Sequence, residues 1–264
     1  MGIKNPAGFL LASRRLLAAL LFGLMLAGCV TETNNRLEQN KDPQKAARAY
    51  VDAGMMYMQR NQMDNAHRTL MRAYEIAPDD PAVNNAVALF FSLEGDHAQT
   101  EKHFKKALSN DPDFSQARNN YAAYLFKRGD YAQAIEHLER VTKDYRYEKR
   151  YTAYENLGLC YLRTGDSDKA LASFQRALKL NNSLPISTLE IAQIKFDRGE
   201  NAVALEYLTR HEKLSKPSPK QLWLGIRLQR ILGDQNKLGS YELQLRNMFP
   251  ASPEYQAYKA SLSS

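Results

Sequence analysis

Cysteine and histidine commonly bind metals or take part in nucleophilic catalysis, and this 264-residue chain has two cysteines and five histidines. The sequence contains no G-x-S-x-G or H-E-x-x-H pattern, no glycine-rich phosphate loop and no cysteine pair spaced for zinc. The histidines match no common ligand spacing: His67, His97, His103, His137 and His211. We therefore expect solvated histidines, no metal or other cofactor, and a protein that is not an enzyme.

Cys160 lies between Leu159 and Tyr161 in an apolar stretch. A reactive cysteine needs nearby cations that lower the pKa of its thiol, and only Arg163 is close in sequence. We expect Cys160 to be a small buried apolar residue.

Cys29 closes an N-terminal segment that is built like a secretory signal. Three basic residues and no acid precede an apolar run from Leu16 to Ala27. This run is shorter than the roughly 20 residues that a membrane-spanning helix needs, and it has the length of a signal-peptide core. The sequence LAGC that ends at Cys29 resembles the bacterial lipobox, in which the cysteine thiol receives a diacylglycerol and becomes the first residue after cleavage. Residues 1–28 are thus predicted to be a lipoprotein signal peptide. The alternative is ordinary signal cleavage near Ala27, which would leave Cys29 free.

Lipidation of Cys29 would place the protein on a membrane, because two or three acyl chains anchor a protein stably. Residue 30 is Val, whereas Asp at this position retains a lipoprotein at the inner membrane in enteric-type sorting. The resemblance to a lipobox therefore implies the periplasmic face of the outer membrane. Residues 29–41 are predicted to be the lipidated cysteine and a flexible polar tether, with a reach of about 19 Å. Asp42 and Pro43 then predict the N-cap and the first residue of a helix.

The remaining chain repeats one pattern, which is clearest in residues 154–177, YENLGLCYLRTGDSDKALASFQRA. Small residues such as Gly158 and Ala170 would let two helices approach closely, larger residues such as Phe174 would fill the space between them, and Gly165 would form the turn. Turn glycines recur 34 to 36 residues apart at positions 95, 129, 165, 199 and 233, and Asn61 lies 34 residues before the first of them.

This spacing and these residue types are similar to those of tetratricopeptide (TPR) repeats. The resemblance implies an all-α TPR solenoid, with six helix-turn-helix repeats in a right-handed superhelix. The TPR domain is expected over residues 42–264, ending in a C-terminal cap. The repeats are expected near 47–80, 81–114, 115–150, 151–184, 185–218 and 219–252.

The third repeat carries two extra residues near the stretch from Lys143 to Tyr151, in which basic residues alternate with tyrosines. One interpretation is a lengthened second helix that buries the tyrosines against the fourth repeat and leaves the charges in water. The alternative is a surface for peptidoglycan, lipid or an acidic partner.

The charge of the chain does not favour nucleic acid as a partner. The formal net charge is +7, and removal of residues 1–28, which carry three basic residues and no acid, leaves 7 − 3 = +4. No Lys/Arg run of the kind that marks a nucleic-acid surface occurs. We also expect no small-molecule substrate.

The first helix of each TPR repeat lines the concave groove of a solenoid, and TPR geometry assigns specific repeat positions to this groove. These positions predict an apolar groove floor with two polar anchors, which would accept an amphipathic helix or an extended apolar peptide. The floor residues are Val51, Met55, Met58, Leu89, Leu93 and Phe126, and the polar anchors are Asn85 and Asn119. The alternative is that some of the methionines pack between helices.

A lipobox, a short tether and six TPR repeats together resemble the PilF/PilW family of type IV pilus biogenesis lipoproteins. The C-terminal sequence RNMFPASPE at 246–254 resembles the ending of that family, and LWLG at 222–225 resembles its sixth repeat. The resemblance implies a pilotin, a monomeric protein that binds the pilus secretin and promotes its outer-membrane localisation and multimerisation. The alternatives are a TPR adaptor lipoprotein that recruits other envelope proteins, such as peptidoglycan hydrolases or proteases, and, less favoured, an enzyme.

Overall fold

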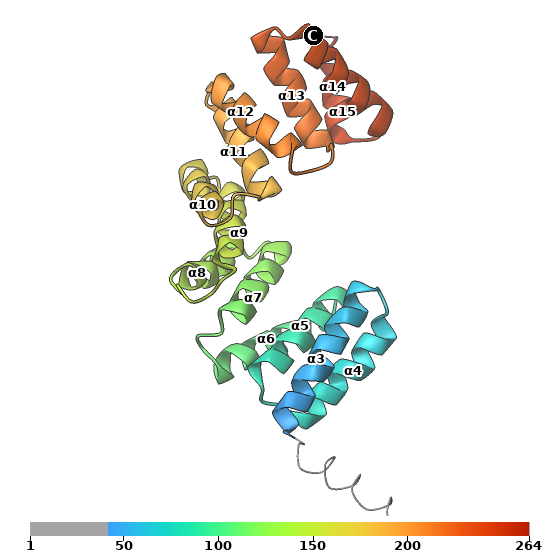
Figure 1. The fold of residues 1–264 in the computed structure, drawn as a ribbon, viewed down its shortest axis with the longest axis vertical. Helices are drawn as coiled ribbons and strands as arrows, with labels where there is room; N and C mark the ends of the chain where they lie inside the picture. The colour runs from blue at the N-terminus through green and yellow to red at the C-terminus, as the bar shows by residue number, and fades with distance from the viewer. Residues whose placement is uncertain (1–41, 264) are drawn as a thin grey trace, which may run out of the picture. The chain divides into compact units, whose positions relative to one another are not determined.

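The computed structural model describes residues 42–263, which contain thirteen α-helices and no β-strand (Figure 1). The predicted signal peptide, Cys29 and the tether lie outside the described residues. Within residues 42–263, no helix combines the length and the apolar character needed to cross a bilayer. The chain divides between Pro78 and Asp79 into two compact units, which are described separately.

The first unit is one helix pair, α3 (Pro43–Gln59) and α4 (Met63–Ile76). The carboxylate of Asp42 accepts hydrogen bonds from the backbone N–H of Gln44 at 3.0 Å and of Lys45 at 3.4 Å, and Pro43 is the first helical residue. The predicted N-cap at residue 42 is therefore confirmed. Asn61 adopts φ 56° in the turn between the helices, a left-handed conformation that asparagine tolerates better than most residues.

The second unit begins with three helix pairs in chain order. These are α5 (Pro81–Glu94) with α6 (His97–Asn110), α7 (Ser115–Arg128) with α8 (Tyr131–Thr142), and α9 (Arg150–Arg163) with α10 (Ser167–Leu180). Two further pairs follow, α11 (Pro185–Asp197) with α12 (Asn201–Glu212) and α13 (Pro219–Leu232) with α14 (Gln235–Met248). The last helix is α15 (Pro253–Ala260).

The five predicted turn glycines all have positive φ values, between 75° and 89°. Residues with a Cβ pay a steric cost in this region, and glycine does not. At Gly95 and Gly129 the next residue donates its backbone N–H to the carbonyl five residues earlier, Asp96 to Phe91 at 3.0 Å and Asp130 to Leu125 at 2.9 Å. Such a bond closes the end of a helix and directs the chain back into the next one. The predicted turns are confirmed.

The α9–α10 pair shows how closely two helices of a repeat approach. A Cβ atom added to Gly158 would lie 2.6 Å from Cε1 of Phe174, whose side chain is fully buried. The small residues Ala170 and Ala177 on α10 are also fully buried. The predicted roles of the small and large residues in this pair are confirmed, because only a residue without a side chain fits opposite the phenylalanine ring.

Replacing Gly158 by Ala is expected to destabilise the protein by about 1–2 kcal/mol. Overpacking against Phe174 costs about 1–3 kcal/mol, and the higher helix propensity of alanine returns up to about 1 kcal/mol. Gly239 on α14 is the matched control, since a Cβ there meets nothing within 4 Å. Gly239→Ala should therefore stabilise the protein by about 0.5–1 kcal/mol. Urea unfolding measures the free energy of unfolding of both variants. A loss of stability in both would contradict the explanation by close contact with Phe174.

The C-terminal residues form a helix that covers the last repeat. Helix α15 packs on α13, where Tyr258 lies edge-on to Trp223 with ring centroids 6.4 Å apart. Tyr255 and Tyr258 contact the buried cluster formed by Leu222, Ile226, Tyr241 and Leu245. The final helix pair thus has an apolar face that would otherwise meet water, and α15 covers it.

The prediction of a lengthened second helix in the third pair is wrong. Helix α8 ends at Thr142, α9 begins at Arg150, and the extra residues form a loop between them. Tyr147 is half-buried and packs against the core, whereas Tyr145 is 81% exposed. The guanidinium of Arg150 lies 4.4 Å from the centre of the Tyr145 ring. The stretch is therefore a loop up to Lys149 that exposes Tyr145, whereas Tyr147 and Tyr151 pack against the core and Arg150 and Tyr151 belong to α9.

Candidate protein-binding surface

The first helices of the pairs form a continuous row within the second unit. Helices α5, α7, α9, α11 and α13 each contact the next helix of this set, whereas α6, α8, α10 and α12 pack mainly against first helices. In a stack of helix pairs, the helices that touch from repeat to repeat lie on the inside of the curve. We call the face of these five helices that is turned away from the second helices the inner surface.

Polar side chains join consecutive helices across the inner surface. Asn120 on α7 donates to Oδ1 of Asn85 on α5 at 3.0 Å, and Asn156 on α9 donates to Oδ1 of Asn119 on α7 at 3.3 Å. Asn85 and Asn119 are consequently both buried. The two predicted polar anchors therefore have side-chain oxygens that accept hydrogen bonds from the neighbouring repeat.

The same arrangement continues toward the C-terminus. Ser187 on α11 donates its backbone N–H and its hydroxyl to Oε2 of Glu155 on α9, at 3.0 and 2.7 Å. Arg227 on α13 donates to Oε1 of Gln193 on α11 at 2.8 Å. These polar links fix the rotation of each repeat on the next. The signal in the sequence was the recurrence of polar residues about one repeat apart in the first helices.

Apolar side chains lie beside these polar links on α5 and α7. Leu89 and Phe126 are half-buried and pack against the main core cluster, whereas Leu93 is 59% exposed. The guanidinium of Arg163 on α9 lies 5.9 Å from the centre of the Phe126 ring. Of the predicted groove residues in this unit, Leu93 therefore presents the most surface to a partner, and Leu89 and Phe126 present part of theirs.

The C-terminal part of the inner surface is cationic and aromatic. The guanidinium of Arg227 lies 4.6 Å from the Phe196 ring centre and 5.5 Å from that of Trp223. Arg230 lies 5.9 Å from the same Trp223 ring, but it donates to the Ser261 hydroxyl at 2.8 Å and pairs with Glu242 on α14 at 3.9 Å, so it lies outside the inner surface. A guanidinium stacked on aromatic rings keeps its planar N–H groups for acceptors, and Gln193 uses part of those of Arg227. The sequence did not indicate these residues as a group, because Phe196 on α11 meets Arg227 on α13 only when the two helices pack together.

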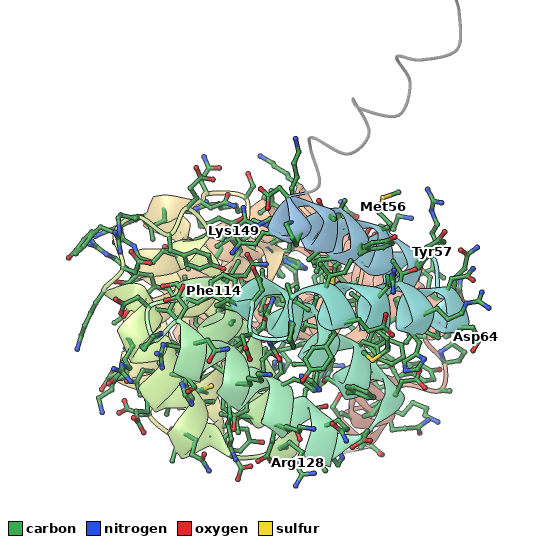
Figure 2. The ribbon with its side chains drawn as sticks, turned by 90° about the horizontal axis from the view of Figure 1, so that it is seen from below. Met56, Tyr57, Asp64, Phe114, Arg128 and Lys149 are labelled. Atoms are coloured by element: carbon green, nitrogen blue, oxygen red, sulfur yellow. The ribbon has the colours of Figure 1, made fainter. Side chains whose placement is uncertain are left out.

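In the first unit, Val51, Met55 and Met58 are half-buried on α3. At about 100° per residue, Val51 and Met58 lie within roughly 40° of the direction shared by Ala47 and Gly54, which face α4. Met55 lies further round the helix. The neighbouring Met56 is exposed on α3 and is labelled in Figure 2. The helix thus carries a methionine-rich face from the α4 contact toward solvent, which suits an adaptable apolar contact.

The prediction that the histidines are solvated is wrong for two of them. His103 and His211 are each only 4% exposed. Nδ1 of His103 lies 3.0 Å from Oδ1 of Asn84, whose amide nitrogen donates to the Asp80 carbonyl. His103 therefore donates from Nδ1 and is neutral, and burial lowers its pKa to about 4. Their positions on second helices looked polar, but each contacts the first helix of its own repeat, His103 at Asn84 of α5 and His211 at Pro185 of α11.

Acid is expected to destabilise the protein through His103. Its folded pKa of about 4 lies below the ordinary value of 6.5, so the unfolded chain binds the extra proton between these pH values. Stability is complete above about pH 6.5 and falls as the pH approaches 4, by about 3 kcal/mol for this group. Urea unfolding at pH 7.5 and 4.5 gives the loss in the free energy of unfolding on acidification, for the wild type and for His103→Gln. The variant should lose less stability on acidification, whereas His97→Gln, at an exposed site, should behave like the wild type.

The remaining candidates for chemistry are buried or dispersed. Cys160 is fully buried, and burial raises the pKa of its thiol to about 11, so that it remains protonated. The prediction of a small buried apolar residue is confirmed. Within residues 42–263, no three His, Cys, Asp or Glu side chains are grouped to hold a metal ion.

Comparison with known proteins identifies the repeat and a close relative. Residues 47–80 and 113–183 match family models described as tetratricopeptide repeat. The chain is 32% identical over 246 residues to the type IV pilus assembly protein PilF of Pseudomonas aeruginosa, which covers 92% of this chain and 98% of that protein. The solved structure of Pseudomonas aeruginosa PilF has a TM-score of 0.81 at 31% identity, over 84% of this chain and all of that one.

A second solved structure has the same fold at lower identity. PilW, described as a widely conserved type IV pilus biogenesis factor, has a TM-score of 0.71 at 24% identity, over 80% of this chain and 97% of that one. Together with the helix pairs and their glycine turns, these matches confirm the predicted all-α TPR solenoid. The chain therefore belongs to the family of the type IV pilus assembly protein PilF, and it is a TPR protein of type IV pilus biogenesis.

Proposed function

We propose that this protein is a pilotin, a lipoprotein that binds the pilus secretin and promotes its localisation and multimerisation in the outer membrane. The observation that carries the proposal is the 32% identity to PilF across 92% of the chain. The match extends over nearly all of both proteins.

The proposed anchor is a lipid on Cys29, supported by the lipobox-like sequence LAGC and the signal-like segment before it. Two or three acyl chains would hold the protein on the periplasmic face of the outer membrane. The short segment from Val30 to Lys41 would keep the repeats within about 19 Å of the lipid. A secretin segment bound by such a protein would be concentrated at the membrane in which it must assemble.

Two separate apolar surfaces are proposed to contact the secretin, one on α5 and α7 of the second unit and one on α3 of the first unit. On α5 and α7, exposed Leu93 and half-buried Leu89 and Phe126 offer apolar area beside fixed polar groups. On α3, Met55 and Met58 offer flexible apolar side chains. Each of these surfaces by itself suits an apolar or amphipathic segment bound as a helix or an extended peptide. The protein needs no bond-making step for this role, and we propose none.

Co-purification tests the function. The full chain, tagged after Ser264 and expressed in its own host, is crosslinked and purified from detergent-solubilised outer membranes. The secretin is expected as the principal partner, and deletion of the gene is expected to remove heat-stable secretin multimers from the outer membrane. Recovery of peptidoglycan hydrolases or proteases without secretin, together with normal multimers in the deletion strain, would instead identify an adaptor for other envelope proteins.

A further inference from the structure

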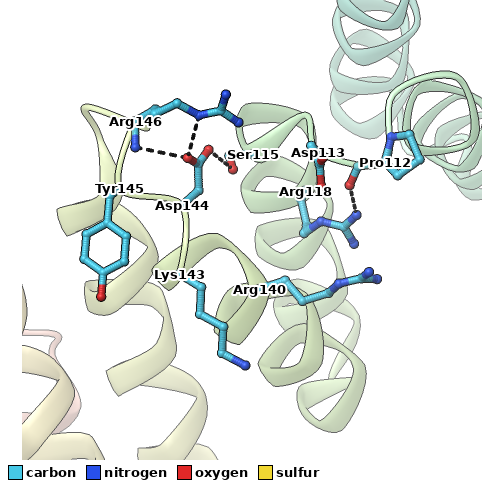
Figure 3. A pocket seen from close by; sticks show the side chains of 9 residues that line it. All are labelled: Pro112, Asp113, Ser115, Arg118, Arg140, Lys143, Asp144, Tyr145 and Arg146. Carbon is cyan, nitrogen blue, oxygen red and sulfur yellow. Dashed lines mark hydrogen bonds and ion pairs between the residues drawn. The ribbon is translucent and has the colours of Figure 1, made fainter.

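A pocket of about 430 Å³ lies where α7 begins and α8 ends, beside the loop that follows α8 (Figure 3). Four basic residues and two acidic ones are among those that line it. The lining includes Ser115, Arg118, Arg140, Lys143, Asp144 and Arg146. Nothing in the pilotin function uses this pocket.

Arg118 is an almost fully buried cation that pairs with no carboxylate among residues 42–263. Its side chain is 6% exposed and donates to the Pro112 carbonyl and toward Nδ1 of His137 at 3.2 Å. Nδ1 of His137 must be unprotonated to accept this bond, and burial together with Arg118 lowers the pKa of His137. Both partners of Arg118 are therefore neutral groups. Its positive charge is offset only at longer range, by Asp111, Asp113 and Glu136.

Arg140 and Lys143 add two more charges without partners to the same pocket. Both are exposed, and no hydrogen bond or ion pair to their side chains occurs among residues 42–263. Figure 3 shows Arg140 extending on the side where the Arg118 guanidinium lies. Burial lowers the pKa of Arg118, and repulsion from the Arg140 guanidinium lowers it further. An anion placed there would remove this repulsion.

The acidic residues of the pocket do not neutralise these cations. Asp144 accepts the hydroxyl of Ser115 at 2.7 Å, and its other oxygen accepts the backbone N–H of Arg146 at 3.0 Å. The Arg146 side chain pairs with the same carboxylate at 3.7 Å. Asp144 is thus committed to the loop and to the start of α7. Asp113 is then the one remaining acid of the pocket beside Arg118, Arg140 and Lys143, which leaves an excess of two positive charges.

The start of α7 adds further positive potential. Ser115 is its first residue, and the N-cap Phe114 provides no side-chain acceptor for the N–H groups of the first turn. Unpaired N–H groups at a helix start favour anions, and this helix is 14 residues long. The helix end thus acts in the same direction as the buried guanidinium and the two exposed cations.

We propose that this pocket binds a phosphate group, with Arg118 as the fixed donor at its base and Arg140 and Lys143 closing on the bound oxygens. A phosphate carries several acceptor oxygens and up to two negative charges, which matches an excess of two positive charges better than a single carboxylate does. The phosphate is either a free phosphate compound or a lipid headgroup, since both present the same oxygens.

Titration of the full chain in a non-ionic detergent, followed by 31P NMR, tests the proposal. Inorganic phosphate is expected to bind saturably. The double variant Arg140→Gln/Lys143→Gln should weaken binding at least about tenfold, because it removes two charge-assisted hydrogen bonds from exposed side chains. The matched control is Arg176→Gln/Lys179→Gln, which removes two exposed cations from α10 and should leave the affinity unchanged.

Dihexanoyl-phosphatidylglycerol, titrated in the same way, distinguishes the two sources. If it binds more tightly than inorganic phosphate and is weakened by the pocket variant alone, the ligand is a lipid headgroup. If inorganic phosphate binds more tightly with the same dependence on the variant, the ligand is a free phosphate compound. Absence of saturable binding by both probes, or an equal loss in the pocket and control variants, would overturn the proposal. No secretin is present in these measurements, so they fail or succeed independently of the proposed pilotin function.

Discussion

Replacement of Cys29 by Ser is expected to move the protein from the outer membrane to the soluble periplasmic fraction. The serine hydroxyl cannot replace the thiol that would receive the diacylglycerol, so the variant would lose all of its acyl chains. Each buried CH₂ contributes about 0.8 kcal/mol to membrane binding, and no span in residues 42–263 can substitute for the anchor. Fractionation and immunoblotting should find essentially no variant in the membrane, and the secretin should be misplaced.

Cys160→Ser is the matched control, because it removes the other cysteine from the buried core of α9. This variant should remain in the membrane even if its stability falls. Mass spectrometry of the native protein should find an acylated N-terminal Cys29. An unmodified residue 29 in native material, or a Cys29→Ser variant that stays membrane-bound, would contradict the proposed anchor.

Replacing Met55, Met58 and Leu89 by Glu is expected to abolish secretin binding. Apolar side chains at the centre of a protein interface contribute about 2–4 kcal/mol each when they are hot spots, and a buried carboxylate without a partner adds a desolvation cost. We therefore expect an affinity loss of at least about 100-fold, measured by biolayer interferometry with immobilised secretin. Pilus assembly should fail in a strain that carries this variant.

The three replaced residues are half-buried, so folding must be controlled separately. Circular dichroism should show unchanged helical content. Leu93→Glu provides a second test, because this side chain is 59% exposed and its replacement should not disturb the fold. It is expected to weaken binding about tenfold. Leu243→Glu on α14, at a site that is 49% exposed, should bind normally. Normal pilus assembly with the triple variant would count against the proposed contact.

The repeat pattern was readable in the sequence because TPR structure is local. The partners that matter most within a repeat, such as Gly158 and Phe174, lie 16 residues apart on two helices joined by one turn. The turn requires a positive φ, which glycine and, less often, asparagine accept. Residue type and spacing therefore determined the helix pairs, their turns and the N-cap at Asp42.

Features that depend on contacts between helices were predicted less well. The burial of His103, the loop at 143–149 and the stacking of Arg227 between Phe196 and Trp223 were all missed. His103 and Arg227 look polar within their own helices, and the residues at 143–149 look like a continuation of α8. The environment of His103 and Arg227 is set by another helix, of the same repeat for His103 and of the preceding repeat for Arg227, whose rotation a periodic pattern does not specify.

The sequence by itself determined the fold class, the turn positions and the family, because one residue pattern repeated at nearly constant spacing defines a unit that can only be stabilised by stacking. It also predicts the lipid anchor, which lies outside the described residues. Only the tertiary structure decided that Asn85 and Asn119 are used between repeats, that Leu93 is the most exposed apolar residue of α5 and α7 among those predicted, and that Arg118 is buried beside Arg140. These outcomes depend on how neighbouring helices rotate against each other, because that rotation decides which polar side chains find a partner and which charges are left without one.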